Sequence, residues 1–185
     1  SDQVVSKADI IDGPNGAGAT DEITISLWAK TNEANPSEAP LTYIVGQDTN
    51  KGATVRGQKT GWSNLFVGKR NDGKAKGRFV FGGFGGNAYT HAAVASSVDV
   101  KRDTWYHIVA TFSNSVPKIY VDGQLAGTGS NNGGKIYSSS EMPFSGDVHI
   151  GTHASNGSPS WVGDIEQVAF WDKAFKHADV RKLYG

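Results

Sequence analysis

Alternating apolar and polar residues run along most of the chain. In residues 22–30, Ile23, Ile25, Leu27 and Ala29 fall on one face, and mostly polar residues fall on the other. Strict alternation predicts a half-buried β-strand, because successive side chains of a strand point to opposite faces. Comparable runs predict further strands at residues 41–46, 62–68, 78–83, 92–98, 105–113, 117–121, 124–128, 147–151 and 161–171.

Turn and helix signals complete the architecture. Asp122 and Gly123 lie between two alternating runs. They predict a two-residue type I′ hairpin, because both central residues of that turn need a positive φ. Helical periodicity is confined to residues 178–184. About ten strands and one short helix, with no internal linker, predict one domain over residues 1–185. The expected fold class is all-β: a two-sheet antiparallel β-sandwich, or jelly roll, with one short C-terminal helix.

The expected core follows from the same alternation. Ile108, Ala110 and Phe112 share one face of their strand, which is the pattern of a core stripe. We expect Trp105 and Phe170 to be core residues as well.

Composition and charge narrow the function classes. The chain has 18 Lys plus Arg and 18 Asp plus Glu, so its formal net charge is zero. This balance argues against a nucleic-acid-binding domain, because such domains normally carry a basic excess. No stretch approaches the ~20 apolar residues needed to cross a bilayer, so we expect no membrane insertion. The absence of cysteine excludes disulfides, thiolate catalysis and cysteine-ligated metal sites.

A succession of motifs in the second half of the chain carries a family resemblance. The motifs are 105–112 (WYHIVATF), 119–123 (IYVDG), 149–151 (HIG), 162–165 (VGDI), 168–171 (VAFW) and 179–184 (DVRKLY). This succession resembles the laminin-G-like and pentraxin-like members of the concanavalin A-like jelly-roll superfamily. The resemblance implies the sandwich fold. It leaves the function open, because the fold hosts lectins, adhesion modules, glycanases and peptide binders.

The signal for catalysis is weak. Glycanases of this fold have a strand with the pattern Glu-x-Asp-x-(x)-Glu, which brings two carboxylates together for retaining hydrolysis. Asp164 and Glu166 come nearest to this pattern, and the third acid is absent. The sequence also lacks a Gly-x-Ser-x-Gly nucleophile motif. We therefore expect that the chain is not an enzyme.

One early loop has the chemistry of a calcium site. Calcium prefers several oxygen ligands from carboxylates, amides and backbone carbonyls. Asp48 and Asn50 are spaced so that two side-chain oxygens can turn towards one point. In the pentraxin-like pattern a comparable loop binds calcium with acids of a later loop, and the two loops meet at one end of the sandwich. Here the later loop, residues 151–157, lacks those acids, so Asn156 or a carbonyl would complete the Ca2+ site.

A second calcium site would lie between the terminal strands. Laminin-G-like domains often hold such an ion, and the resemblance implies Asp9, Asp12 and Asp164 as ligands, near Glu166. The alternative is that these are ordinary surface or turn acids.

Aromatic residues beside glycine-rich turns are candidate ligand platforms. Trp62, Tyr89 and Trp161 have this placement. Sugar rings stack on exposed aromatic rings, and peptide side chains fill aromatic-walled pockets. Trp28 falls on the polar face of its strand, which makes it a further candidate for exposure. The alternative is that these rings pack at sheet edges or under loops.

We expect the ligand site where the loop with Asp48 and Asn50 meets the loop with His153, Ser155 and Asn156. Loops at one end of a sandwich are held by the sheets and are free to vary, so recognition collects there. The neutral groups of the later loop suit a polar ligand. The alternative is that both segments are solvated turns.

The favoured function is a non-catalytic extracellular binding module. It would recognise a glycan or short peptide on another cell or surface in a calcium-dependent manner, as a monomeric module of a larger chain. The resemblance suits a bacterial surface adhesin. The alternative is a carbohydrate-binding module attached to a polysaccharide-degrading enzyme.

Overall fold

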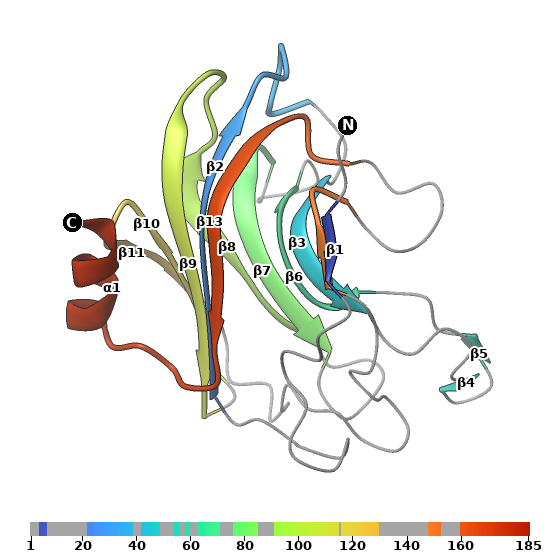
Figure 1. The fold of residues 1–185 in the computed structure, drawn as a ribbon, viewed down its shortest axis with the longest axis vertical. Helices are drawn as coiled ribbons and strands as arrows, with labels where there is room; N and C mark the ends of the chain where they lie inside the picture. The colour runs from blue at the N-terminus through green and yellow to red at the C-terminus, as the bar shows by residue number, and fades with distance from the viewer. Residues whose placement is uncertain are drawn as a thin grey trace.

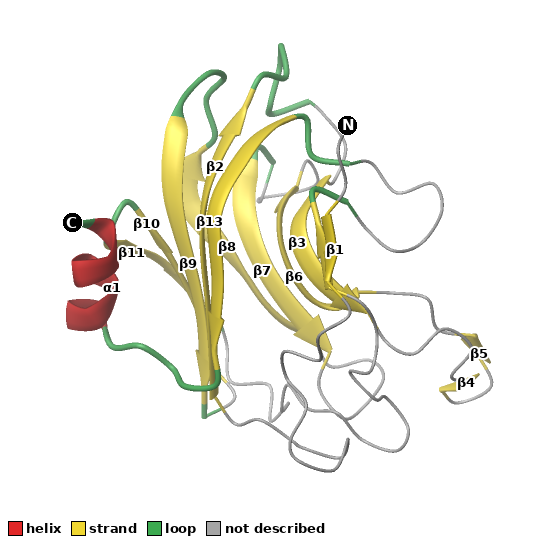
Figure 2. Cartoon of the chain, in the orientation of Figure 1, coloured by secondary structure: helices red, strands yellow, loops and turns green. Residues whose placement is uncertain are grey.

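Two antiparallel sheets face each other in the computed structural model (Figures 1 and 2). It describes residues 4–6, 22–38, 42–48, 54–55, 58–59, 63–70, 76–84, 91–114, 116–129, 148–152 and 160–185. The six-stranded sheet consists, in order, of β1 (Val4–Ser6), β12 (Val148–Ile150), β3 (Thr42–Asp48), β6 (Ser63–Arg70), β7 (Arg78–Phe84) and β8 (His91–Asp99). The five-stranded sheet consists of β11 (Gln124–Thr128), β10 (Val116–Val121), β9 (Trp105–Ser113), β2 (Glu22–Thr31) and β13 (Gly163–Trp171).

The predicted jelly-roll sandwich is confirmed. All the predicted strands are present, with ends that differ by a few residues. Three short strands were not predicted: β1, β4 (Thr54–Val55) and β5 (Gln58–Lys59). Runs of two or three residues carry too little alternation to be recognised in a sequence.

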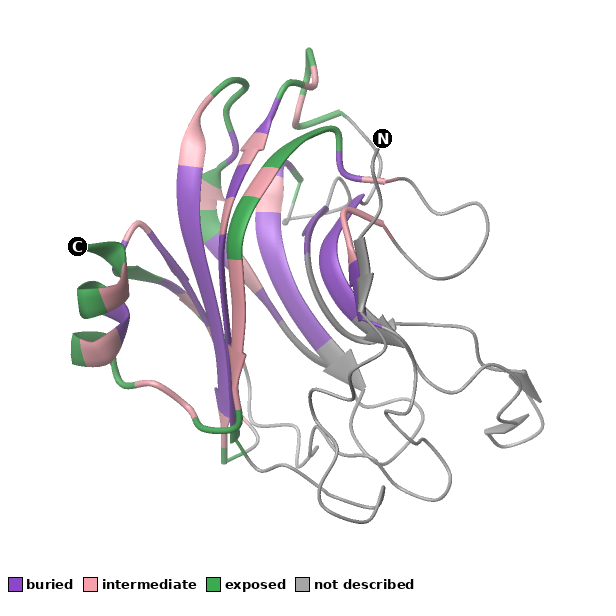
Figure 3. Ribbon diagram, viewed as in Figure 1, coloured by how far each residue is buried: buried purple, intermediate pink, exposed green. Residues whose placement is uncertain are grey.

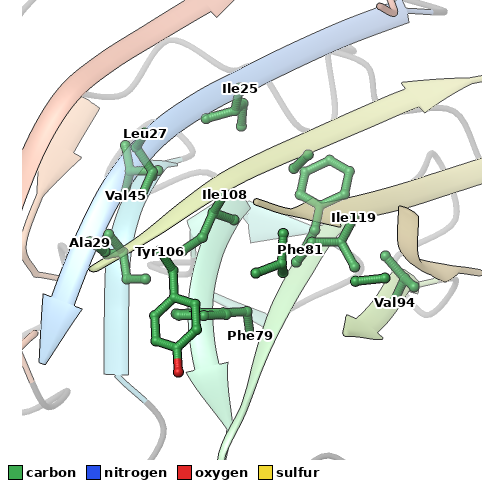
Figure 4. Close-up of a cluster of buried hydrophobic side chains, with 14 of the residues drawn as sticks. Ile25, Leu27, Ala29, Val45, Phe79, Phe81, Val94, Tyr106, Ile108 and Ile119 are labelled. Carbon is green, nitrogen blue, oxygen red and sulfur yellow. The ribbon is translucent and has the colours of Figure 1, made fainter. Parts of the chain in front are cut away.

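The core lies between the two sheets. Ile23, Ile25, Leu27 and Ala29 of β2 are at most 1% exposed, as their alternation predicted. Across the core, Phe79 and Phe81 of β7 are fully buried, and Figure 4 shows them beside Tyr106, Ile108 and Ile119. Figure 3 shows the buried stretches continuing along the central strands of both sheets.

The prediction that Trp105 is a core residue is wrong. Tyr106, Ile108, Ala110 and Phe112 belong to the core cluster. Trp105 therefore lies on the opposite, outer face of β9, because side chains of a strand alternate. It is half-buried there, with its ring 5.0 Å from the Nζ atom of Lys30. Phe170, the other predicted core aromatic, is partly buried and packs against the cluster.

The predicted hairpin and helix are both present. Asp122 and Gly123 have φ angles of 50° and 73°, as a type I′ turn requires. The helix α1 (His177–Tyr184) packs on the outer side of the five-stranded sheet, away from the other sheet (Figure 1). Its buried residue is Val180, which joins Val109 and Tyr120 in a second apolar cluster. Within the described ranges, no helix is long and apolar enough to cross a membrane.

A buried ion pair attaches the segment after β2 to the six-stranded sheet. The side chain of Lys69 on β6 is 0% exposed, and its Nζ lies 2.8 Å from Oε2 of Glu33. The same ammonium donates a hydrogen bond to the carbonyl oxygen of Pro36, at 2.8 Å. The Glu33 carboxylate also accepts from the hydroxyl of Thr31, at 3.4 Å. Lys69 thereby holds two points of the segment 32–38 against the sheet.

Candidate functional site

Most of the predicted site residues lie outside the described part of the chain. These residues are Asp9, Asp12, Asn50, Trp62, Tyr89, His153, Ser155 and Asn156. Asp48 is the last residue of β3, where its backbone pairs with Ser63 of β6. The ligand and calcium roles of these residues remain predictions.

The strand register bears on the expectation that the two predicted loops share one end of the sandwich. β12 pairs with β3 in antiparallel fashion, with Val148 opposite Gln47 and Ile150 opposite Val45. The chain after Asp48 therefore leaves at the end where β12 begins, whereas the chain after Ile150 leaves at the end where β3 begins. The strand ends that precede the two loops thus lie at opposite ends of the β3–β12 pair, because antiparallel neighbours run in opposite directions. The loops themselves lie outside the described residues, and their meeting stays a prediction.

Trp161 and Asp164 are the predicted site residues whose side chains the structure describes. Trp161 is 4% exposed and belongs to the core cluster, so its ring is not offered to a ligand at the surface. Asp164 is exposed on β13, and its Oδ2 lies 2.8 Å from the Nζ of Lys30. This contact raises the pKa of Lys30. Among the described residues, no group of three or more His, Asp or Glu could hold a metal ion.

An aromatic stack occupies the outer face of the five-stranded sheet. Trp28 of β2 and His107 of β9 are direct cross-strand partners, with ring centroids 5.0 Å apart. Tyr184, in the last turn of α1, stacks on both rings at centroid distances of 5.8 and 5.9 Å. Trp28 is therefore half-buried rather than freely exposed, because the helix covers it with a ring.

His107 is the buried titratable member of this stack. Its Nε2 lies 2.9 Å from the hydroxyl of Ser26, and within the described residues its Nδ1 has no hydrogen-bond partner. The backbone N–H of His107 donates to Oδ1 of Asp122, at 2.9 Å. Burial lowers the pKa of His107, and the nearby Asp122 charge opposes this effect. The neutral imidazole is therefore the form that suits this position.

We expect the free energy of unfolding to decrease when the pH is lowered from about 7.5 to about 5.5. The reason is that His107 accepts a proton more readily in the unfolded chain than in the folded one. With a lowered pKa in the folded state, stability is fully present above the unfolded pKa of ~6.5 and is lost as the pH falls below it. Urea unfolding at both pH values measures the change. The variant His107→Gln should show a smaller change; an equal change in both proteins would assign the effect to other groups.

A hollow of about 510 Å³ lies between the β10–β11 hairpin and the end of α1. This volume falls within the range of ~300–1,000 Å³ that is usual for ligand pockets. The hollow is lined by Asp122, Gly123, Gln124, Ala178, Arg181, Lys182, Tyr184 and Gly185. Tyr184 is 44% exposed, so it connects the hollow with the aromatic stack behind it.

Glycine is needed at the tip of the hairpin for two reasons. Gly123 has a positive φ, and a Cβ atom at this position would lie 3.3 Å from the Tyr184 ring. The close approach of hairpin and helix is reinforced by His177, whose Nε2 lies 3.0 Å from the Gly123 carbonyl oxygen. The hairpin is thus held against the helix at the wall of the hollow.

The hollow was not predicted from the sequence. Asp122 and Gly123 were interpreted as a structural turn, and Tyr184 as part of an apolar helix face. The sequence contains one indication of an aromatic surface near the hollow, namely Trp28, an aromatic residue on the polar face of its strand.

Comparison with known protein families identifies the superfamily of the chain. A laminin G profile described as the concanavalin A-like lectin/glucanases superfamily matches residues 6–181. The chain belongs to this superfamily. The fold is thus of a type found in binding modules, as the resemblance implied.

One known protein resembles the chain at low sequence identity. A mouse (Mus musculus) protein, "Sushi, von Willebrand factor type A, EGF and pentraxin domain-containing protein 1", is 23% identical over 165 residues, which are 87% of this chain and 4% of that protein. The chain thus spans a small part of that relative.

Two solved structures share the fold. One is the native heptameric SAP-like pentraxin of Limulus polyphemus, with a TM-score of 0.61, 20% identity and coverage of 91% of this chain and 72% of that one. The other is domain 4 of AbnA, an extracellular arabinanase from Geobacillus stearothermophilus, in complex with arabinotriose. It has a TM-score of 0.60, 16% identity and coverage of 93% and 70%.

Proposed function

We propose that the chain is a non-catalytic module that binds a glycan in the hollow between the β10–β11 hairpin and α1. The observation that carries the proposal is the placement of Tyr184. Its ring is supported by Trp28 and His107, and the residue lines the hollow and is 44% exposed. A ring that is held in place before binding loses little freedom on binding, and aromatic faces suit the apolar faces of sugars.

Polar groups around the ring suit a hydroxyl-rich ligand. Gln124 and Arg181 line the hollow with Asp122. The Oδ1 atom of Asp122 accepts a hydrogen bond from the backbone N–H of His107, so Oδ2 can accept a hydrogen bond from a ligand hydroxyl. A few placed polar groups beside an apolar surface are typical of small-ligand sites. The arabinotriose complex of a domain with this fold supports a glycan as ligand.

The absence of catalysis is part of the proposal. Asp164 and Glu166 lie on the outer face of β13, opposite Lys30 and Trp28 in the register. Asp164 is engaged by the Lys30 ammonium at 2.8 Å. We therefore infer a surface ion pair rather than an acid and nucleophile pair. The proposal includes an extracellular location and an adhesive role within a larger chain. The alternative is attachment of the module to a polysaccharide-degrading enzyme.

The variant Tyr184→Ala tests the site. It should lower affinity about tenfold for whichever sugars a glycan and peptide array identifies, since an aromatic contact contributes ~1 kcal/mol or more. Tyr184→Phe keeps the ring and should retain binding. Val162→Ala removes another exposed apolar side chain, 47% exposed and not part of the hollow, and should also retain binding. Unchanged affinity in a folded Tyr184→Ala protein would move the site elsewhere.

We also propose that the chain binds calcium through the acidic and amide residues that the sequence predicted as ligands. Asp48 and Asn50 would form one site with backbone carbonyl oxygens, and Asp9 and Asp12 would supply the second without Asp164, whose carboxylate contacts Lys30. Calcium at a hundredfold excess over Kd should stabilise the fold by ~2.7 kcal/mol. Thermal melts with calcium and with chelator measure this, and Asp48→Asn should reduce the difference. Identical melts of the wild type would refute calcium binding.

A further inference from the structure

Among the side chains that line the hollow, positive charges outnumber negative ones, in a chain whose formal net charge is zero. Arg181 and Lys182 are consecutive residues near the end of α1, and both line the hollow. Asp122 is the acidic side chain among the lining residues, and its Oδ1 is bonded to the backbone N–H of His107. Two basic residues therefore line the hollow beside one partly engaged carboxylate.

Neither cation is strongly neutralised by its surroundings. Lys182 lies 3.9 Å from Asp179, with side chains that are 80% and 48% exposed. Such a long, solvated contact contributes little. Arg181 has no acidic partner within ion-pair distance among the described residues. Its five N–H donors are thus available to a ligand.

We propose that the hollow selects sugars that carry an acidic group, a carboxylate or a sulfate. Arg181 binds the acid, Lys182 adds a second charge, and Tyr184 stacks on the sugar ring; the inference rests on the proposed glycan function. Arginine presents a planar fork that matches two oxygens of an oxyanion. A hydroxyl offers one oxygen and no charge, so a neutral sugar gains less from this arrangement.

Basic residues in the last turn of a helix have another, purely structural explanation. They interact favourably with the carbonyl groups at the helix C-terminus. That role predicts that their removal changes stability without changing which ligands bind. Ligand selectivity is therefore the readout that separates the two explanations.

The test is a glycan array in which each neutral oligosaccharide has a carboxylated and a sulfated counterpart on the same sugar skeleton. Wild-type protein should bind acidic members about tenfold more tightly than neutral ones, and more weakly at high salt. Arg181→Gln should abolish this preference, and Lys182→Gln should reduce it. Lys76→Gln removes the same charge from an exposed turn before β7 and should leave the preference intact. A thermal melt of each variant controls for folding.

Each outcome is decisive. Preferential binding of carboxylated members, of sulfated members or of both, lost in Arg181→Gln, supports the inference and names the acid. Equal binding of neutral and acidic counterparts, unaffected by Arg181→Gln, overturns the inference and leaves the glycan function standing. Binding to no glycan at all overturns both.

Discussion

Replacing Glu33 by alanine is expected to lower the free energy of unfolding by about 3–5 kcal/mol. The Lys69 side chain is 0% exposed, and its ammonium is held by the Glu33 carboxylate and the Pro36 carbonyl oxygen, each at 2.8 Å. Without the carboxylate, the buried charge keeps one neutral acceptor. Removal of one partner from a buried pair is strongly destabilising because the other charge stays buried and uncompensated.

Urea unfolding of three variants measures this effect. Asp99→Ala breaks the exposed pair of Arg78 and Asp99, with side chains 36% and 73% exposed, and should lower stability by less than about 1 kcal/mol. The double variant Glu33→Leu with Lys69→Met should recover much of the stability lost in Glu33→Ala, since it removes both charges. A loss below about 1 kcal/mol in Glu33→Ala would contradict the burial of the pair.

The second large effect is expected in the core. Phe112→Ala should lower the free energy of unfolding by about 3–5 kcal/mol, because it leaves a cavity between the sheets. Phe112 is 0% exposed, and its neighbours in the register are Ile23 on β2 and Pro117 on β10.

Trp105→Ala on the same strand is the matched comparison. Trp105 is the larger side chain, but it is half-buried on the outer face under Lys30. Its removal exposes surface instead of creating a closed cavity, so the loss should be smaller than for Phe112→Ala. Urea unfolding of both variants checks the order, and the reverse order would place the strand in the opposite phase.

Much of the fold could be predicted from the sequence, because its signals are local. Alternation in β2 identified the inward residues Ile23, Ile25, Leu27 and Ala29, since the period of two is a property of any strand. The turn at Asp122 followed from the φ angles that a two-residue hairpin imposes.

Trp105 shows where residue type misleads. A large aromatic residue favours burial on average. The phase of β9 nevertheless places Tyr106 inside and Trp105 outside, and phase rather than size decides the face.

The site depended on tertiary structure. The register of β12 against β3 places the strand ends that precede the two predicted loops at opposite ends of the pair, and loop sequences contain no information on strand order. The hollow requires the Asp122 hairpin to meet Tyr184, and Tyr184 to reach Trp28. The sequence by itself determined the strands, their inward faces, the hairpin and the helix, because these depend on neighbours within a few residues. Only the tertiary structure decided which distant segments meet, because strand order and register depend on how the whole chain buries its apolar faces.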